Sequence, residues 1–371
     1  MTGAWDHLTA DDVPGRRRAS RPRSKRRPAH AEAEPAMVVA VDRGRYLTRL
    51  EGREVVAVKA RELGHRGVVV GDEAYLVGDT SGREGALARI VRLGPRRTEL
   101  RRATDEGRGR ERVIVAGADQ MVIVAALASP EPRPGMIDRQ LVAAYDAGMG
   151  AVLCLTKSDL ASDLELRALY GPLGVAMVTT GRVVGRAGGA DDDAAAGGGD
   201  DAGPDGGHGG GHDDAAAGGG DDGIGRRIVG LDEVRRLLAG RVSVLVGHSG
   251  VGKSTLINAL APGAARATGA VNPVTGKGRH TSSSAVALEL PGGGWVIDTP
   301  GVRSFGLSHV RPERVLAGFP DLAAAAADCH RGCDHGPHST DCGLRQWAQT
   351  SAARRMRLDS YLRIVASREG Y

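Results

Sequence analysis

The sequence predicts an α/β protein in which a doubly wound parallel sheet is preceded by a small β-barrel and followed by a helical C-terminal segment. Two observations carry this prediction. Strand-like and helix-like patterns alternate from about residue 110 onward, whereas short strand-like runs separated by turn residues occupy residues 37–104. A length of 371 residues suits two or three domains.

The first segment, residues 1–36, has no apolar periodicity and contains a strongly basic block. Residues 16–27 hold eight Lys and Arg and no acidic residue. We expect a disordered, solvated tail. Such a tail is compatible with RNA contact, because each phosphate that it neutralises adds salt-sensitive affinity.

Residues 37–104 are predicted to form a barrel of the oligonucleotide-binding (OB) type. Alternating runs at Met37–Tyr46, Glu54–Lys59, Arg66–Leu76 and Ala86–Leu93 indicate four or five strands. A barrel that only serves as a spacer is the alternative to one that binds nucleic acid. The arginines that we expect to be exposed favour nucleic acid; they are Arg43, Arg45, Arg49, Arg96, Arg97, Arg101 and Arg102.

The net charge of +5 conceals an asymmetry along the chain. Residues 187–225 contain ten Asp and no Lys or Arg, so the rest of the chain carries about +15 (5 + 10). A basic body of this kind favours a polyanionic partner. The acidic segment is rich in Gly and Ala and repeats residues 192–201 verbatim at 213–222, which predicts a disordered insertion in a surface loop.

Nothing in the sequence indicates a membrane protein. There is no run of eighteen apolar residues, and the N-terminus is polar and basic. We therefore expect a cytoplasmic protein without a membrane partner.

The most informative stretch is a phosphate-binding loop. Gly247, four residues, and then Gly252-Lys253-Ser254 match its pattern between an apolar strand and the start of a helix. We expect Lys253 at the β- and γ-phosphates of a nucleoside triphosphate and Ser254 on Mg²⁺. The residues predicted to contact the nucleotide are Gly247, His248, Ser249, Gly250, Val251, Gly252, Lys253, Ser254 and Thr255.

A second motif, Asp298-Thr299-Pro300-Gly301, ends an apolar strand 46 residues after Gly252. At a strand end Asp298 can hold Mg²⁺ through water, and the Gly301 N–H can meet the γ-phosphate. The spacing and the strand make this motif specific.

The tetrapeptide Thr156-Lys157-Ser158-Asp159 follows the apolar strand Ala151–Leu155 and is expected to read the base. A carboxylate at Asp159 would accept hydrogen bonds from the guanine ring N–H and amino group, while the Lys157 stem lies along the ring. Adenine leaves that charge unmatched, so discrimination is on the order of a hundredfold or more. A solvated loop after a strand is the alternative.

The order of these motifs is unusual. A guanine-reading motif normally follows the phosphate loop, whereas here it precedes the loop by about ninety residues. A circular permutation preserves spatial contacts while it moves the termini. We therefore predict a circularly permuted P-loop GTPase domain over residues 105–318.

At this point the sequence resembles the RsgA (YjeQ) family of circularly permuted GTPases that mature the small ribosomal subunit. The resemblance implies GTP hydrolysis stimulated by that subunit, an N-terminal OB fold, and a C-terminal zinc domain that binds RNA. It covers residues 37–371 and rests on the OB-like segment, Thr156–Leu160, Gly247–Thr255, Gly278–Thr281, Asp298–Gly306 and a terminal Cys/His cluster.

The resemblance also implies roles for three further residues. Val302 stands where Ras-like GTPases carry the water-orienting Gln, so His280 is expected to orient the attacking water. Thr281 is our first choice for the hydroxyl that meets Mg²⁺. Base recognition is expected to finish at Thr179, in the Ser-Ala-like loop that we place at Thr179–Thr180, directly before the acidic insertion. The family motif begins with Asn, so Thr156 is expected to brace the phosphate loop only in part.

The terminal cluster predicts one structural zinc ion in a helical domain over residues 319–371. Cys329, Cys333, His335 and Cys342 supply three thiolates and one imidazole, a closed tetrahedral set. His330 and His338 compete with His335 as the fourth ligand. Free thiols in a reducing compartment are the alternative to a metal site.

The leading functional hypothesis is a monomeric GTP hydrolase that binds the small ribosomal subunit and its rRNA, with Mg²⁺ bound alongside GTP or GDP. One alternative is a zinc and OB RNA-binding protein in which the nucleotide is a passive switch. Another is an ATP-using phosphotransferase, against which Asp159 argues.

Overall fold

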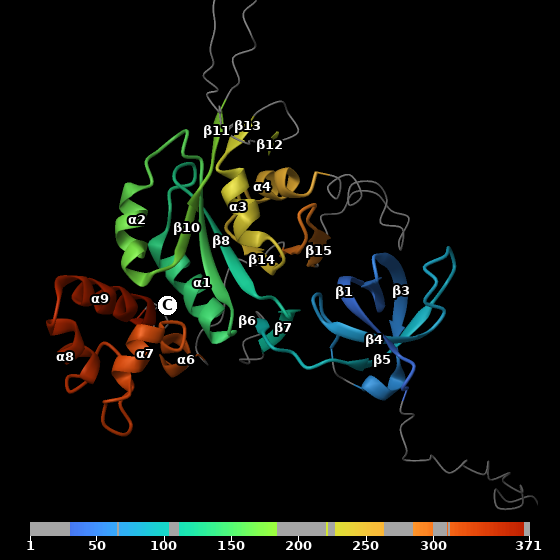
Figure 1. Cartoon of the computed structure of the whole chain (residues 1–371), viewed down its shortest axis with the longest axis horizontal. Coiled ribbons are helices and arrows are strands. Elements are labelled where there is room, and N and C mark those ends of the chain that lie inside the picture. Colours follow the sequence, from blue (N-terminus) through green and yellow to red (C-terminus); the bar gives the residue numbers. More distant parts are fainter. Residues whose placement is uncertain are drawn as a thin grey trace, which may run out of the picture. The chain divides into compact units, whose positions relative to one another are not determined.

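The computed structural model describes residues 30–64, 67–103, 111–183, 220–221, 227–262, 285–299, 310 and 312–366 (Figure 1). The predicted basic tail lies outside these residues up to residue 29, and so does most of the predicted acidic insertion. Within the described ranges, no helix has the length and apolar character needed to cross a lipid bilayer.

The N-terminal part of the described chain is a closed five-stranded barrel. Its strands pair in the order β1-β2-β3-β5-β4, and β4 pairs back with β1. The predicted first strand is split by a turn at Arg43 and Gly44, whose φ angles of 42° and 85° suit a two-residue hairpin. The OB-type prediction is therefore confirmed. The strands are β1 (Glu34–Asp42), β2 (Arg45–Leu50), β3 (Arg53–Lys59), β4 (Glu73–Gly78) and β5 (Ala88–Leu93).

One arginine predicted to lie on the barrel surface does not. The Arg96 side chain is 11% exposed, and its Nε and Nη2 donate to the two carboxylate oxygens of Asp72 at 2.7 and 2.8 Å. Asp72 is buried and also accepts from the Val69 N–H at 2.8 Å. Arg96 therefore holds the barrel together, because a buried carboxylate needs a paired cation.

A two-stranded ladder follows the barrel. β6 (Glu99–Ala103) pairs antiparallel with β7 (Glu111–Ala116). Residues Arg112–Ala116 lie in the segment for which the sequence predicts a parallel sheet, but they form a strand of this antiparallel ladder instead. The run is as apolar as a buried parallel strand. Among the described residues, its one β-bridge outside this ladder joins Val115 to Val70.

The central sheet holds five parallel strands in the order β10-β9-β8-β14-β16, with β15 antiparallel to β16. β8, from the first half of the domain, lies directly beside β14, which precedes the phosphate loop. The circular permutation is therefore confirmed in the strand order. The strands are β8 (Gln120–Ala126), β9 (Gly150–Thr156), β10 (Ala176–Thr179), β14 (Val242–Val246), β15 (Val286–Glu289) and β16 (Trp295–Asp298).

Alternate residues of these strands point into two different cores, as the period of a strand requires. Ile123 and Ala125 belong to a core with α1 (Pro134–Asp146) and α2 (Leu164–Tyr170). Val122 and Val124 belong to a core with α3 (Leu231–Leu238) and α4 (Lys253–Leu260). The sheet is therefore covered by helices on both faces, as predicted, although α3 was not anticipated.

Short elements connect α2 to β10 and β10 to α3. η2 (Gly171–Leu173) leads into β10, and β11 (Gly181–Val183) pairs with β13 (Arg227–Val229), which also pairs with β12 (Gly220–Asp221). Another short 3-10 turn, η1 (Arg61–Leu63), lies in the barrel.

The C-terminal helices pack on α1 rather than forming a separate core. Phe319 lies 4.8 Å from the Tyr145 ring of α1 and 5.8 Å from the Tyr361 ring, both edge to face. The same core includes residues of all four helices (Figure 1). The helices are α6 (Pro312–Leu316), α7 (Pro320–Ala326), α8 (Gly343–Gln349) and α9 (Ala352–Ala366).

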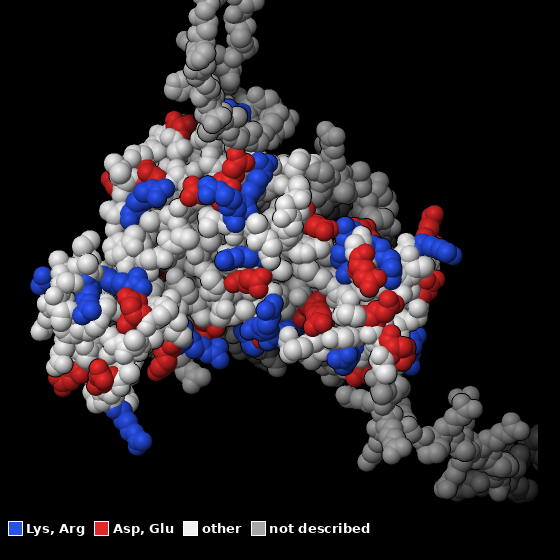
Figure 2. All heavy atoms as spheres, viewed as in Figure 1, with Lys and Arg blue, Asp and Glu red and all other residues white. Residues whose placement is uncertain are grey.

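Charged side chains of both signs are interspersed over the barrel and the helices on the face seen in Figure 2. Some of this mixing is local pairing: Arg49, on β2, contacts Glu289 at 2.6 Å and Glu54 at 3.8 Å. On this face the excess of basic residues does not gather into one uninterrupted basic patch.

Candidate nucleotide site and metal cluster

The predicted phosphate loop joins the C-terminal end of β14 to the start of α4. Gly252 caps α4 with φ at 92°, a conformation that residues with a Cβ rarely adopt. The Leu256 N–H donates to the Gly252 carbonyl at 2.9 Å, the first hydrogen bond within the helix. The amides of residues 253–255 therefore point out of the helix end, where an anion can accept from them.

Asp298 lies beside this loop at the end of β16. β14 and β16 are parallel neighbours with Leu245 opposite Asp298, and the Thr299 hydroxyl donates to the Leu245 carbonyl at 2.9 Å. The Lys253 ammonium donates to Asp298 Oδ1. The two motifs thus meet at the ends of adjacent strands, where ligands bind in open α/β sheets.

The Thr156–Asp159 motif reaches the same place from the other side. Thr156 is the last residue of β9, and its hydroxyl donates to the Val251 carbonyl of the phosphate loop at 2.5 Å, across 95 residues of chain. The Ala125 carbonyl lies 3.4 Å from the same hydroxyl. The motif that precedes the loop in sequence therefore lies against it in space.

The rest of the motif is held by backbone hydrogen bonds. The Ser158 N–H donates to the Thr180 carbonyl at 3.1 Å, and Asp159 Oδ1 accepts from the Arg182 N–H at 2.9 Å. Lys157 adopts φ of 63°, and its ammonium donates to the Ser129 carbonyl. The Asp159 carboxylate is therefore oriented before any ligand is considered.

The Thr179 side chain connects the end of β10 to the start of α2. Its hydroxyl donates to Asp163 Oδ2 at 2.5 Å and accepts from Arg167 Nη2 at 2.8 Å. The hydrogen bond from Thr179, and then one from Arg167 Nε to the same carboxylate, lower the pKa of Asp163 below its ordinary value. The Thr179 hydroxyl thus holds the start of α2 against the end of β10.

Arg182 is a residue of this region that the sequence analysis missed. Its guanidinium Nη2 donates to the Thr255 hydroxyl in the first turn of α4 at 3.2 Å. No sequence motif includes Arg182, because it becomes a neighbour of Thr255 only through folding.

Three predicted residues, His280, Thr281 and Gly301, lie outside the described residues.

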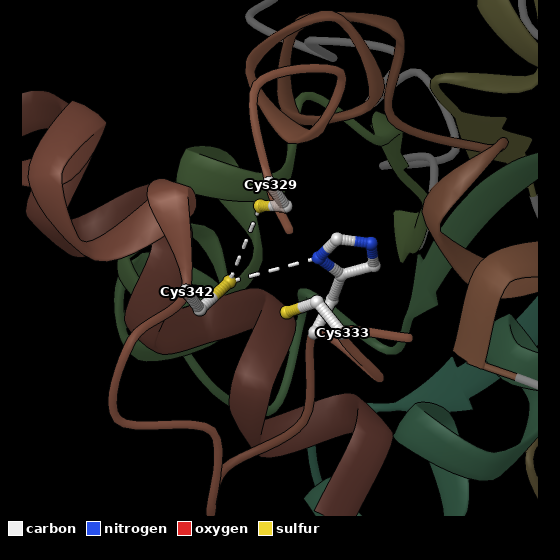
Figure 3. A group of neighbouring side chains, drawn as sticks. Cys329, Cys333 and Cys342 are labelled. Carbon is white, nitrogen blue, oxygen red and sulfur yellow. Dashed lines mark hydrogen bonds between the residues drawn. The ribbon is translucent and has the colours of Figure 1, made fainter. Parts of the chain in front are cut away.

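The four predicted metal ligands come together between α7 and α8. Their ligand atoms all lie within 4.8 Å of one another, with Cys329 Sγ 3.9 Å and His335 Nδ1 3.6 Å from Cys342 Sγ. Figure 3 shows the three cysteine side chains pointing toward one another. The sulfur–sulfur distance is far beyond a disulfide bond of about 2.05 Å. Three thiols and one imidazole at this spacing could hold a metal ion.

The candidate histidines His335 and His330 differ in whether they lie in the cluster. His335 lies in it, whereas the His330 ring contacts the Arg331 carbonyl at 3.1 Å. Burial, and then the neighbouring Cys333, raise the pKa of Cys342 to about 12. Three sulfurs and one imidazole nitrogen within 4.8 Å of one another are a donor set that could hold a metal ion as thiolates and neutral imidazole.

A family model described as RsgA GTPase matches residues 93–185 and 226–308 of this chain. The chain is similar to proteins named small ribosomal subunit biogenesis GTPase RsgA. It is 34% identical to that of Pseudomonas aeruginosa strain LESB58 over 307 residues, which is 81% of this chain and 76% of the relative. It is 35% identical to that of Ectopseudomonas mendocina over 285 residues, 75% and 69% of the two chains.

Two solved structures share the fold. The first is YjeQ from Thermotoga maritima, with a TM-score of 0.60 and 21% identity, covering 91% of this chain and 99% of that chain. The second is YloQ, titled a circularly permuted GTPase, with a TM-score of 0.57 and 18% identity, covering 93% and 98%.

Proposed function

This chain belongs to the RsgA GTPase family, and we propose that it hydrolyses GTP to GDP and phosphate as a late maturation factor of the small ribosomal subunit. The relatives carry that function in their names. The observation that supports it most directly is the Thr156–Val251 hydrogen bond, because it brings the base-reading motif onto the phosphate loop.

We assign the phosphate end of GTP to the loop and to Asp298. Lys253, which donates to Asp298 in the structure, would move its charge to the β- and γ-phosphates when GTP is bound. Ser254 and Thr281 would hold Mg²⁺ directly, Asp298 would hold it through water, and the Gly301 N–H would meet the γ-phosphate. Mg²⁺ neutralises the charge that develops on the phosphate oxygens.

We assign the base end to the Thr156–Asp159 motif. The oriented Asp159 carboxylate would accept from the guanine ring N–H and amino group, and the Lys157 stem would cover the ring. Adenine lacks that pair of donors. This assignment predicts tighter binding of GDP than of ADP, which is the reverse of what an ATP-using phosphotransferase would show.

Hydrolysis is assigned to His280. Val302 cannot orient water, so intrinsic turnover is expected to be slow, and an imidazole can orient or polarise water near neutral pH. In this scheme GTP favours docking on the subunit, and hydrolysis favours release.

The metal in the Cys/His cluster is assigned as one structural Zn²⁺. Three sulfurs and one nitrogen form a closed tetrahedral set with no open position for a substrate. Zinc would cross-link the helices α7 and α8 and would take no part in GTP hydrolysis.

We propose that rRNA is contacted by the barrel (37–104) and the metal domain (319–371), with the basic tail at 1–36 adding affinity. Both signs of charge alternate on the face seen in Figure 2, so contact would involve separate basic side chains rather than one uninterrupted patch. The protein would act as a cytoplasmic monomer, with no membrane partner.

The test is a GTPase assay on the full chain with isolated small subunits, large subunits and neither. Small subunits are expected to raise turnover strongly, and large subunits are expected to leave it unchanged. The His280→Ala variant is expected to keep GTP binding and lose the stimulated turnover, by about 10²- to 10⁴-fold as for other positioned acid–base groups.

Each outcome separates the hypotheses. Stimulated turnover that survives in His280→Ala removes that residue's role and leaves the function standing. Subunit binding without any turnover would support the passive RNA-binding switch. Preference for ADP over GDP would support the phosphotransferase.

A further inference from the structure

The proposed base-reading residue Asp159 lies in a short loop. The loop covers residues 157–163 and connects the end of β9 to the start of α2. Within it the Leu160 N–H donates to the Lys157 carbonyl at 2.9 Å, so the chain turns at Asp159. The direction of the Asp159 carboxylate therefore depends on how both ends of the loop are held.

Thr180, the residue that follows β10, holds the first end of the loop. Its N–H donates to the Leu155 carbonyl of β9 at 2.7 Å, and its carbonyl accepts from the Ser158 N–H at 3.1 Å. Thr180 is buried, so these hydrogen bonds lie away from water. A Cβ placed on the next residue, Gly181, would come within 2.3 Å of Ser158 Oγ, so this segment is closely packed on the loop.

Asp163 is the last residue of the loop, and its carboxylate holds the second end. Its Oδ2 accepts from the Thr179 hydroxyl and from Arg167 Nε, each at 2.5 Å. Arg167 Nη2 also donates to the Thr179 hydroxyl oxygen at 2.8 Å, which closes a ring of three hydrogen bonds. Each bond has a charged partner and is therefore stronger than a bond between neutral groups. Thr179 and Thr180 thus hold the two ends of the loop from adjacent positions.

The carboxylate of Asp163 does not cap the helix that it precedes. An aspartate in the N-cap position usually accepts a hydrogen bond from an amide in the first helical turn. Asp163 stands in the N-cap position of α2, yet within the described chain its side chain makes no such bond. The carboxylate accepts from the end of β10 instead, and this contact fixes the end of the loop rather than the amides of the helix.

We propose that Asp163 is a positioning residue for guanine recognition, which acts by fixing the loop that carries Asp159. The proposal rests on the proposed function, because it requires Asp159 to accept hydrogen bonds from guanine. A shift of the second end of the loop changes the distance and angle at which the Asp159 carboxylate meets the ring N–H and the amino group. Hydrogen bonds weaken steeply at poor angles. In this role the Thr179 hydroxyl and Arg167 act through Asp163.

Asp163→Ala tests this role through a ratio of two affinities. Inosine diphosphate (IDP) lacks the amino group of guanine that Asp159 is assigned to read, but it keeps the sugar and both phosphates. A loosened loop is expected to lower the ratio of GDP to IDP affinity by about two- to thirtyfold, the range of coupling for residues that act on a site through others. A residue that only stabilises the fold would lower both affinities together and leave the ratio unchanged.

Thr179 provides the second variant and its control. Thr179→Val removes the hydroxyl and is expected to lower the ratio as Asp163→Ala does, whereas Thr179→Ser keeps the hydroxyl and the wild-type ratio. The double variant, Asp163→Ala with Thr179→Val, is expected to lose no more than either single variant, because both break the same hydrogen bond. Asp232→Ala is the matched control, with the wild-type ratio expected. It removes an acid in the first turn of α3 that contacts Arg235 at 2.8 Å.

Affinities are measured by competition against a fluorescent GDP on the full chain, with melting temperatures of the nucleotide-free variants as the folding control. If Asp163→Ala is unfolded at the assay temperature, the ratio in Thr179→Val decides.

Three results would overturn the proposal. They are an unchanged GDP-to-IDP ratio in the folded variant, an equal loss in Thr179→Val and Thr179→Ser, and losses that add in the double variant. The last result would give the Thr179 hydroxyl a contact of its own with the nucleotide. If the wild type itself does not select GDP over IDP and ADP, the proposed function fails instead, so the two failures are distinguishable.

Discussion

Thr156 shows how one hydroxyl can stand in for a larger side chain. The family motif begins with Asn, and the sequence predicted that Thr would brace the phosphate loop only in part. Its hydroxyl has two carbonyl neighbours, Val251 at 2.5 Å and Ala125 at 3.4 Å, but one proton to donate. The brace is therefore a single hydrogen bond to Val251, made in a buried place.

Removing that hydroxyl is expected to loosen the loop. Thr156→Val keeps the β-branched shape and leaves a buried carbonyl without its side-chain donor, at about 1–3 kcal/mol of unfolding free energy. GDP affinity is expected to fall as well, because the loop amides are less well placed. Urea unfolding and GDP titration measure the two effects. Thr156→Ser is the control, since it keeps the donor, and an equal loss in both variants would contradict the brace.

At the scale of elements, the Cys/His cluster ties α7 to α8. Cys342 caps α8, Cys329 follows α7, and the Gly343 N–H donates to Cys329 Sγ at 3.2 Å. Among the residues that the structure describes, no hydrogen bond of the cluster reaches a residue of the proposed nucleotide site. Metal and nucleotide should therefore be separable.

His335→Ala is expected to lose the metal, whereas His338→Ala keeps it, because only His335 lies among the thiols. Metal analysis of the purified variants measures this, and equal zinc in both would contradict the assignment of His335. Loss of the ion is expected to expose the chain between α7 and α8 to limited proteolysis, since a structural zinc supplies folding free energy. GDP binding is expected to persist.

At the scale of the whole molecule, an ion pair connects the C-terminal helix α9 to α1, which covers one face of the sheet. Arg363 of α9 donates to Asp138 of α1, and the Tyr170 hydroxyl donates to the same oxygen at 2.9 Å. Burial raises the pKa of Asp138 above its ordinary value, although the Arg363 guanidinium pulls it down. Desolvation thus outweighs the attraction, as in many buried pairs.

Arg363→Met is expected to destabilise the fold by about 3–5 kcal/mol, because it leaves a buried carboxylate without its cation. The pKa of Asp138 is then raised further above its unfolded value of about 4. A folded-state pKa that is raised gives stability that is present below the unfolded pKa and lost as pH rises through the raised one. The deficit in unfolding free energy relative to wild type, measured by denaturant unfolding, should therefore be larger at about pH 8 than at about pH 5.

The double variant Asp138→Asn with Arg363→Met provides the control. It removes both charges, so its deficit is expected to be smaller than that of Arg363→Met and independent of pH. A single variant as stable as the double at every pH would show that the pair does not join these helices.

The sequence by itself determined the segments and their chemistry. Period and composition located the barrel strands, the strand Ala151–Leu155, the phosphate loop, the base-reading motif and the Cys/His cluster, because these signals are local. The order of the motifs even indicated the permutation, since function requires them to meet. The helix α3 was missed although its buried residues Leu231, Val234 and Leu238 recur at helical spacing.

The tertiary structure alone decided which residues become neighbours. It paired Arg96 with Asp72, moved Arg112–Ala116 out of the parallel sheet, chose His335 among three histidines, and brought Arg182 to Thr255. Each of these depends on strand register and chain path across many residues, and a side chain's partner across such a distance leaves no trace in its immediate sequence.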